Sequence, residues 1–206
     1  MEYITNQDLE KYADLVKNDV KYGHAEIIID KALKDNPQNN DIAMISMKIS
    51  LIDITNGTNL SRNLGKEDGL YKLAEKISHV DFDNRVRAGD LTLVEELARW
   101  TKECLGKNLF SFISKYCLYH NVHCYDKDDY AIFDSVLCKN IYKYIEPDEY
   151  NRLTDKSLKG NSFFKMKEEY NYKQYMEVLN YILEKNKITV EKPHRKLDWY
   201  IWYKNK

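Results

Sequence analysis

Two lysines that precede one aspartate have the residue types and the order that amine chemistry at an electrophilic carbon requires. Lys107 and Lys115 both precede Asp134, and Lys115 is the nearer of the two in sequence. A lysine amine that has lost its proton is a nucleophile and forms imines with carbonyl carbon atoms. A carboxylate within reach of the reacting carbon stabilises the positive charge that develops there. The sequence therefore supplies a nucleophile and a charge-stabilising partner, provided that the fold brings them together.

These residues lie in a stretch whose pattern predicts a buried helix, a polar loop and a second helix. Apolar side chains recur at helical spacing over residues 110–118, and residues 120–129 are polar and then densely charged. Asp134 directly precedes the segment 135–145, whose apolar residues share one helical face. An aspartate in that place is well suited to be an N-cap, because its carboxylate accepts hydrogen bonds from the first free backbone N–H groups.

The sequence around these residues resembles a known family of DNA repair enzymes. The run FSFISKYCLYHN, followed by AIFDSVLCKN, is similar to the signature of the 8-oxoguanine-DNA-glycosylase-like family within the helix-hairpin-helix DNA glycosylase superfamily. Two further segments fit this family, SHVDFDNRVRAGDLTLVEELA at 78–98 and RKLDWYIWYKNK at 195–206. The resemblance touches about half of the chain and does not extend to the amino-terminal segment 1–60.

The resemblance implies a fold, a reaction and a partner. The fold would be all-α, with two helical lobes around a groove. In such glycosylases a lysine attacks C1′ of the damaged nucleoside, and an aspartate at the next helix start assists the attack and stabilises the cationic sugar. Base excision, often with strand cleavage through a Schiff base, would follow on duplex DNA with a flipped base such as 8-oxoguanine. The family's chemistry implies no cofactor.

The resemblance leaves two lysines open as the nucleophile. Better-known members carry a glycine-rich hairpin just before the lysine, where backbone amides and a helix end hold a DNA phosphate. Here only Leu105-Gly106-Lys107 corresponds to that hairpin, at a predicted helix start. An archaeal branch of the family also lacks the hairpin and has a long lysine-to-aspartate separation, which favours Lys107. Lys115 has the more usual separation but falls within a helix, and both lysines stay open.

A non-catalytic interpretation accounts for the same residues. A lysine near a helix start is usually a solvated side chain, and a capping aspartate needs no other role, since a cap alone contributes about 1 kcal/mol. The second hypothesis is therefore a helical DNA-binding or protein-interaction module, such as one used in phage defence, that keeps the fold without the reaction. The missing glycine hairpin favours this hypothesis, whereas the lysine and the helix-opening aspartate favour the enzyme.

The second half of the chain carries the charge expected of a DNA-binding surface. Residues 1–103 contain 14 basic and 19 acidic side chains, and residues 104–206 contain 18 and 14. Affinity for phosphates depends on local rather than total charge. Near the carboxyl end, Lys192, Arg195, Lys196 and Trp199 mix basic and aromatic side chains that could contact the backbone and stack on bases. We expect these four residues to bind DNA.

The cysteines indicate reduced thiols and no metal centre. All four, Cys104, Cys117, Cys124 and Cys138, lie close together in sequence, in a chain that shows no secretion signal. Cys117 and Cys124 could share a helical face with His120, which makes a zinc site conceivable. The CxxC and HxxxH pairs that characterise zinc sites are absent from the sequence, so we expect no metal.

The rest of the sequence predicts a helical, soluble and cytoplasmic protein. Hydrophobic residues make up 43% of 206 residues, enough for one domain over 1–206, within which residues 1–60 could form an amino-terminal lobe. The sequence has no apolar run long enough to cross a membrane and no charged-then-apolar amino terminus. Periodicity and breakers predict helices at about 6–21, 24–35, 40–54, 67–77, 82–87, 90–104, 135–145 and 162–185, and sustained alternation at period two is nowhere found.

Overall fold

A computed structural model describes residues 1–60, 64 and 68–205, and every regular element in these ranges is a helix. The predicted all-α fold class is thus confirmed for this part of the chain. Residue 67, at the start of one predicted helix, and Lys206, the last residue of the carboxyl-terminal segment, lie outside the described residues. The elements are α1 (Asn6–Asn18), α2 (Tyr22–Asp35), α3 (Ile42–Asn56), α5 (Gly69–His79), α6 (Phe82–Arg87), α7 (Thr92–Leu105), α8 (Phe110–Tyr125), α9 (Ser135–Asn140), η1 (Ile141–Tyr144), α10 (Pro147–Thr154), α11 (Ser162–Glu168), α12 (Tyr172–Lys185) and α13 (Pro193–Lys204).

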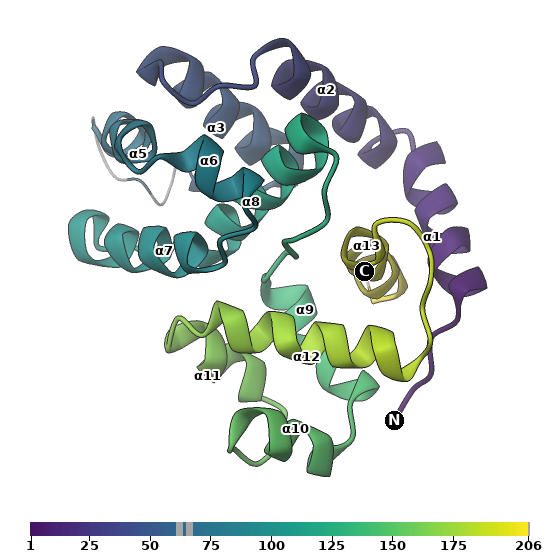
Figure 1. The fold of residues 1–206 in the computed structure, drawn as a ribbon. Coiled ribbons are helices and arrows are strands. Elements are labelled where there is room, and N and C mark those ends of the chain that lie inside the picture. Colours follow the sequence, from purple (N-terminus) through teal and green to yellow (C-terminus); the bar gives the residue numbers. More distant parts are fainter. Residues whose placement is uncertain (61–63, 65–67, 206) are drawn as a thin grey trace.

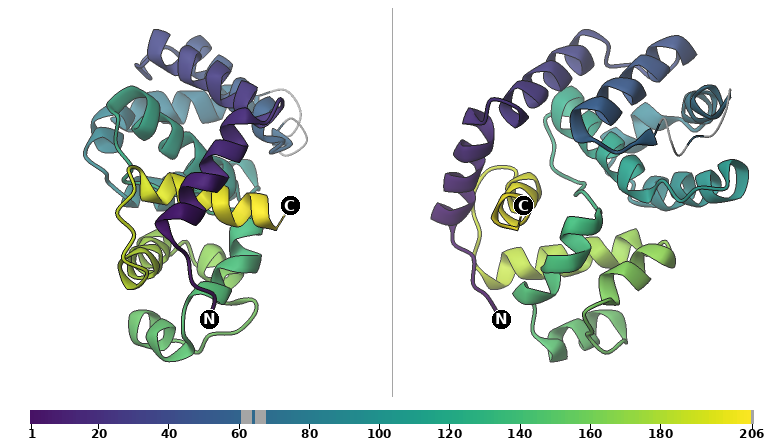
Figure 2. Two further views of the ribbon diagram at one scale, coloured as in Figure 1. Left: turned by 90° about the vertical axis from the view of Figure 1, so that its right-hand side faces the viewer. Right: turned by 180° about the vertical axis from the view of Figure 1, so that it is seen from behind.

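The helices form two groups joined by an extended segment (Figure 1). One group contains α2, α3 and α5 to α8, and the other contains α9 to α12 with η1. Residues 126–134 connect them, and α1 packs on α13 along one side, as both further views show (Figure 2). Within residues 1–60, the possible amino-terminal lobe, α1 contacts α2 and α13, α2 contacts α3 and α8, and α3 contacts α5.

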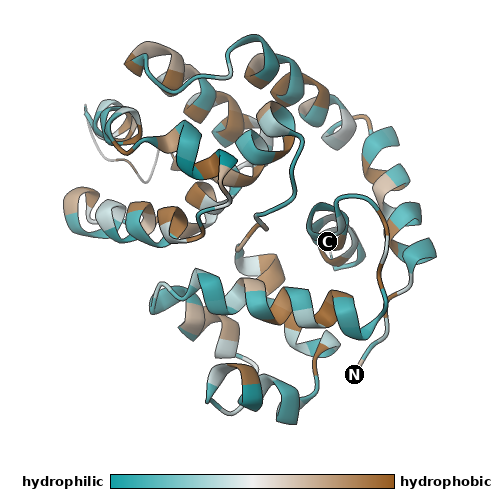
Figure 3. Cartoon of the chain, in the orientation of Figure 1, coloured by the Kyte–Doolittle hydropathy of each residue, from teal (hydrophilic) through white to brown (hydrophobic). Residues whose placement is uncertain are grey.

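Several helices, such as α5 and α7, turn an apolar stripe inward and a polar face outward, which Figure 3 shows as alternating brown and teal along the ribbons, whereas α8 is buried over most of its length. In α7, for example, Leu93, Val94 and Leu97 are fully buried, whereas Glu96 is exposed. Burial of such stripes is the main source of helix stability in a helical protein. Packing of buried apolar side chains from different helices therefore sets the positions of the two groups of helices.

The predicted cap at Asp134 is confirmed, and the helix that it begins is shorter than expected. The Asp134 carboxylate accepts hydrogen bonds from the backbone N–H groups of Val136 and Leu137. The predicted helix over 135–145 is α9 followed by the 3-10 helix η1. A 3-10 turn at a helix end tightens the backbone where i to i−4 bonding stops.

Three other boundaries differ from the sequence predictions. The helix α8 continues to Tyr125, although residues 120–125 were predicted as loop. The predicted helix over 162–185 is broken into α11 and α12 at Tyr170, which has a left-handed φ of 60°. Residues 147–154 form α10, a helix that the sequence does not predict, with Pro147 in its first turn, where the lack of an N–H costs nothing.

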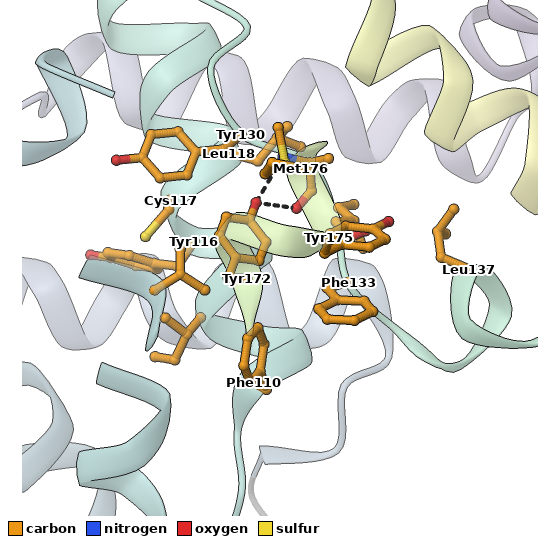
Figure 4. Close-up of a cluster of buried hydrophobic side chains, with 14 of the residues drawn as sticks. Phe110, Tyr116, Cys117, Leu118, Tyr130, Phe133, Leu137, Tyr172, Tyr175 and Met176 are labelled. Carbon is orange, nitrogen blue, oxygen red and sulfur yellow. Dashed lines mark hydrogen bonds between the residues drawn. The ribbon is translucent and has the colours of Figure 1, made fainter. Parts of the chain in front are cut away.

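Aromatic side chains of α12 hold the extended segment that leads to Asp134. The Tyr172 hydroxyl donates to the Ala131 carbonyl at 2.5 Å and accepts from the Ala131 N–H at 2.8 Å, as the dashed lines in Figure 4 show. The Tyr175 hydroxyl donates to the Ile132 carbonyl at 2.7 Å, and its ring stacks on Phe133 with centroids 3.8 Å apart. These bonds satisfy buried backbone groups that lack a helical partner, so the segment is fixed in place.

Candidate functional site

The fold brings Lys115 to Asp134. The Lys115 ammonium Nζ lies 3.1 Å from Oδ2 of Asp134, and the two side chains are only 10% and 13% exposed. Because Oδ1 of Asp134 accepts the two backbone N–H groups of α9, each carboxylate oxygen has a defined partner. Charge-assisted hydrogen bonds of this kind fix the orientation of both groups.

Hydrogen bonds between α8 and the extended segment position this pair. The Ser114 hydroxyl accepts a hydrogen bond from the Phe133 N–H at 3.0 Å, and the Ser111 hydroxyl donates to the Phe133 carbonyl at 3.3 Å. Both serines lie close to Lys115 on α8. Phe133, the residue before Asp134, is therefore hydrogen-bonded to the helix that carries Lys115. These bonds set the distance between Lys115 and Asp134.

The Lys115–Asp134 pair lines a cavity of about 80 Å³ whose other walls are aromatic and charged. Helices α1, α2, α3, α8 and α13 contribute to it. We call this space the aromatic cavity. Its aromatic side chains are Tyr22, Tyr119, Trp199 and Trp202, and its charged side chains are Glu26, Lys115, Asp134, Arg195 and Asp198.

Arg195 organises the charged wall of the aromatic cavity. Its guanidinium is only 5% exposed, donates to both Glu26 and Asp198, and lies over the rings of Trp199 and Tyr119 at 4.7 and 5.0 Å from their centroids. Burial raises the pKa of Asp198 to about 7, against the opposing attraction of Arg195. The wall thus holds a carboxyl group that exchanges a proton near neutral pH, next to the Lys115–Asp134 pair.

A second, larger cavity of about 530 Å³ adjoins the first and shares with it Glu26, Arg195 and Trp199. All four residues predicted to bind DNA, Lys192, Arg195, Lys196 and Trp199, line this second cavity. Lys192 and Lys196 are paired with Asp126 and Glu10, respectively. The structure therefore collects the predicted residues at one place, with all three cations, Lys192, Arg195 and Lys196, paired with carboxylates.

Lys107 is not brought to Asp134. It is exposed and follows Gly106, whose left-handed φ of 69° ends α7, and its N–H is bonded back to the Thr101 carbonyl at 3.3 Å. The predicted helix start at Lys107 is wrong, because α8 begins at Phe110. Lys107 lines neither of the two cavities. The lysine that meets the aspartate is Lys115, the one with the shorter and more usual separation.

Three residues in or beside the site escaped the sequence interpretation: Glu26, Asp198 and Lys167, whose Nζ donates to the hydroxyl of Ser111 on α8. The Tyr119 hydroxyl lies 2.9 Å from Oδ1 of Asn56 and 3.2 Å from Oε1 of Glu26, and it donates its single proton to one of them. The outer wall of the cavity therefore depends on α2 and α3, far from the signature in sequence. Asp198 could have been noticed as an acidic residue three positions after Arg195 in a basic and aromatic helix. Nothing in the sequence marks Glu26 or Lys167.

The cysteines are free thiols, and burial of Cys117, Cys124 and Cys138 opposes the thiolate form that binds metals. Burial raises the pKa of Cys124 to about 11 and that of Cys138 to about 12. Burial also lowers the pKa of His120 to about 3, and its Nδ1 is 2.8 Å from the Tyr116 carbonyl oxygen. Among the described residues, no group of three His, Cys, Asp or Glu side chains is arranged to hold a metal ion.

Comparison with known proteins identifies the family of the first part of the chain. Residues 8–128 match the HI_0787_N family, which is described as an N-terminal domain. The chain belongs to this family. The matched residues include Lys115, Tyr119 and Glu26, whereas Asp134 and α13 lie beyond them.

A relative from Haemophilus influenzae, named only as an uncharacterized protein, is 29% identical over 122 residues. The alignment covers 59% of this chain and 49% of the relative, so the chain matches about half of that protein's length. No solved structure matches. No helix in the described ranges combines the length and apolar character needed to span a membrane.

Proposed function

We propose that this protein is a DNA glycosylase with lyase activity, built on the helical glycosylase-like architecture that its sequence resembles. The observation that carries the proposal is the contact between the Lys115 amine and the Asp134 carboxylate, 3.1 Å apart in the wall of an aromatic cavity. The residue types, their separation in sequence and the cap at Asp134 all agree with the pattern of that family.

In the proposed reaction, Lys115 is the nucleophile and Asp134 assists it. Asp134 accepts a proton from the Lys115 ammonium, and the neutral amine attacks C1′ of a flipped nucleotide. The C1′–Nζ bond forms as the bond from C1′ to the base breaks. The base leaves with the bonding electron pair and takes up the proton that Asp134 had accepted, which restores the Asp134 carboxylate. Positive charge at the sugar is stabilised by the carboxylate until the Schiff base forms.

The aromatic cavity must widen to receive a base. A cavity that holds a single benzene ring has a volume of about 150 Å³, so the volume of about 80 Å³ is too small for a purine. Trp199 lines both this cavity and the larger one of about 530 Å³. In the proposal, rotation of Trp199 toward the larger cavity opens the space for the flipped base between the remaining aromatic side chains.

Borohydride trapping tests this function. The protein would be incubated with duplex DNA containing 8-oxoguanine or an abasic site, and borohydride would reduce any Schiff base to a stable adduct. We expect an adduct with the wild type and none with Lys115→Gln, while Asp134→Asn should form it at least about 100-fold more slowly. Lys107→Gln is the matched control and should behave like the wild type.

A non-catalytic DNA-binding or protein-interaction module is the second candidate, and one observation favours it. The connection between α7 and α8 contains a single glycine, Gly106, and no glycine-rich hairpin that could present several backbone amides to a phosphate. This candidate predicts that the wild type releases no base from a panel of lesions and forms no adduct, even where it binds DNA.

A further inference from the structure

Hydrogen bonds through one serine join α11 to the part of α8 that carries Lys115. Lys167 on α11 donates from Nζ to the Ser111 hydroxyl, and that hydroxyl donates to the Phe133 carbonyl. Ser111 is one helical turn before Lys115, so the two side chains leave α8 on the same face, about 6 Å apart along the axis. Phe133 directly precedes Asp134. Through Ser111, the Lys167 ammonium is therefore fixed beside the Lys115–Asp134 pair, outside the aromatic cavity.

Lys167 differs from the other cations of the proposed site because no carboxylate compensates its charge. Asp134 binds Lys115, and two carboxylates bind Arg195. In the described part of the chain, the hydrogen-bond partner of Lys167 is the neutral Ser111 hydroxyl. A partly buried ammonium is usually paired with an anion, because burial removes part of its hydration. A lysine ammonium carries several N–H donors, so Lys167 can bind an anion from outside the protein while it keeps its bond to Ser111.

The position of Lys167 suits a phosphate of the DNA backbone. In the proposed reaction the Lys115 amine meets C1′ of the flipped nucleotide, and the phosphates of that nucleotide are only a few bonds away from C1′. A group about one helical turn from Lys115 lies within this reach. The Asp134 carboxylate opposes a second anion only weakly, because Lys115 and two backbone N–H groups of α9 already bind it.

We propose that Lys167, positioned by Ser111, binds the phosphodiester group next to the flipped nucleotide. This subsite holds the DNA strand so that C1′ faces the Lys115 amine, and it contacts the backbone without reading the base. The inference rests on the proposed function. It also differs from the sequence prediction, whose DNA-binding lysines, Lys192 and Lys196, are both paired with carboxylates.

Fluorescence anisotropy tests the subsite with a duplex that carries a central tetrahydrofuran, an abasic analogue that forms no Schiff base. Lys167→Met should bind this duplex about three- to tenfold more weakly than the wild type in low salt. The slope of log K against log salt should become shallower by about 0.9, the value for one phosphate contact. Lys165→Met, at an exposed lysine of the same helix, is the matched control and should bind like the wild type. Lys167→Gln carries the same test if the Met variant does not fold.

Methylphosphonate linkages identify the phosphate that Lys167 contacts. Such a linkage replaces one charged oxygen of a phosphodiester by a methyl group and so removes the charge. On one side of the tetrahydrofuran, it should weaken binding by the wild type about as much as Lys167→Met does. The two changes together should weaken binding no further, because both remove the same contact. Additive losses with the linkage on either side, or an unchanged salt slope in Lys167→Met, would overturn the inference.

Borohydride trapping on abasic DNA separates this inference from the proposed function. A contact between Lys167 and one phosphate, without any adduct in the wild type, rejects the glycosylase and keeps the subsite. Adducts in the wild type together with additive losses keep the glycosylase and reject the subsite. A wild type that binds neither duplex rejects both.

Discussion

Asp198→Asn should make the stability of the protein less dependent on pH. Burial raises the pKa of Asp198 to about 7 in the folded state, whereas an aspartate in the unfolded chain has a pKa of about 3.9. Between these values the folded state binds more protons than the unfolded state, so the free energy of unfolding falls as pH rises. A difference of about three units corresponds to at most about 4 kcal/mol, at 1.36 kcal/mol per unit. This penalty is small near pH 4, where the unfolded aspartate begins to ionise, and is complete only about one unit above pH 7.

Urea unfolding at pH 4.5 and pH 8 would measure this effect. The wild type should lose more stability between the two values than Asp198→Asn, by about 2 to 4 kcal/mol. The substitution also weakens the bond from Arg195 to residue 198, although Arg195 keeps Glu26 as a partner. The resulting loss of stability is present at both pH values, so it cancels in the comparison. Asp148→Asn, at an exposed aspartate of α10, is the matched control and should keep the wild-type dependence. Equal pH dependence in the wild type and Asp198→Asn would refute the reasoning.

Two further substitutions test how the fold is held together. Tyr172→Phe removes both hydrogen bonds to the backbone of Ala131 and leaves two buried polar groups unsatisfied. In urea titrations it should therefore lower the free energy of unfolding by about 2 to 4 kcal/mol. A loss below about 0.5 kcal/mol would contradict the role given to this tyrosine. Burial lowers the pKa of Lys48 to about 8, so the unfolded state binds the extra proton between about pH 8 and 10.4 and stability should rise over that window. Thermal unfolding across these pH values should show the rise in the wild type and not in Lys48→Met.

The features that the sequence predicts correctly are those set by residues close together along the chain. Asp134 is recognised as a cap because a cap needs only an acidic residue before an apolar helical face. The predicted helix over 82–87 agrees with α6, although Asp81 before it makes no side-chain cap bond. The loop predicted over 120–129 begins only at Asp126, because tertiary contacts outweigh polarity in the last part of α8. Asn121 donates to the Val86 carbonyl and to Asp129, and the His120 ring packs edge-on against Phe82. The contacts with Val86 and Phe82 join segments that are far apart in sequence.

The choice between the two lysines shows why a site is harder to predict than a cap. Glycine and a predicted helix start favoured Lys107, but Gly106 ends α7 and does not begin α8. The shorter lysine-to-aspartate separation was the better signal, because Lys115 reaches Asp134 through the serine contacts of α8 with Phe133. Glu26, Lys167 and Asp198 reach their places through the packing of helices that are distant in sequence. No local sequence pattern records such packing.

The central claim is that Lys115 is the nucleophile of a DNA glycosylase, and peptide mapping of a borohydride-trapped adduct tests it most directly. Protein trapped on abasic duplex DNA would be digested, and the lysine that carries the sugar would be identified by mass spectrometry. The account predicts that the modified residue is Lys115 and that Lys107→Gln forms the same adduct. An adduct on another lysine, or no adduct with the wild type, would contradict it.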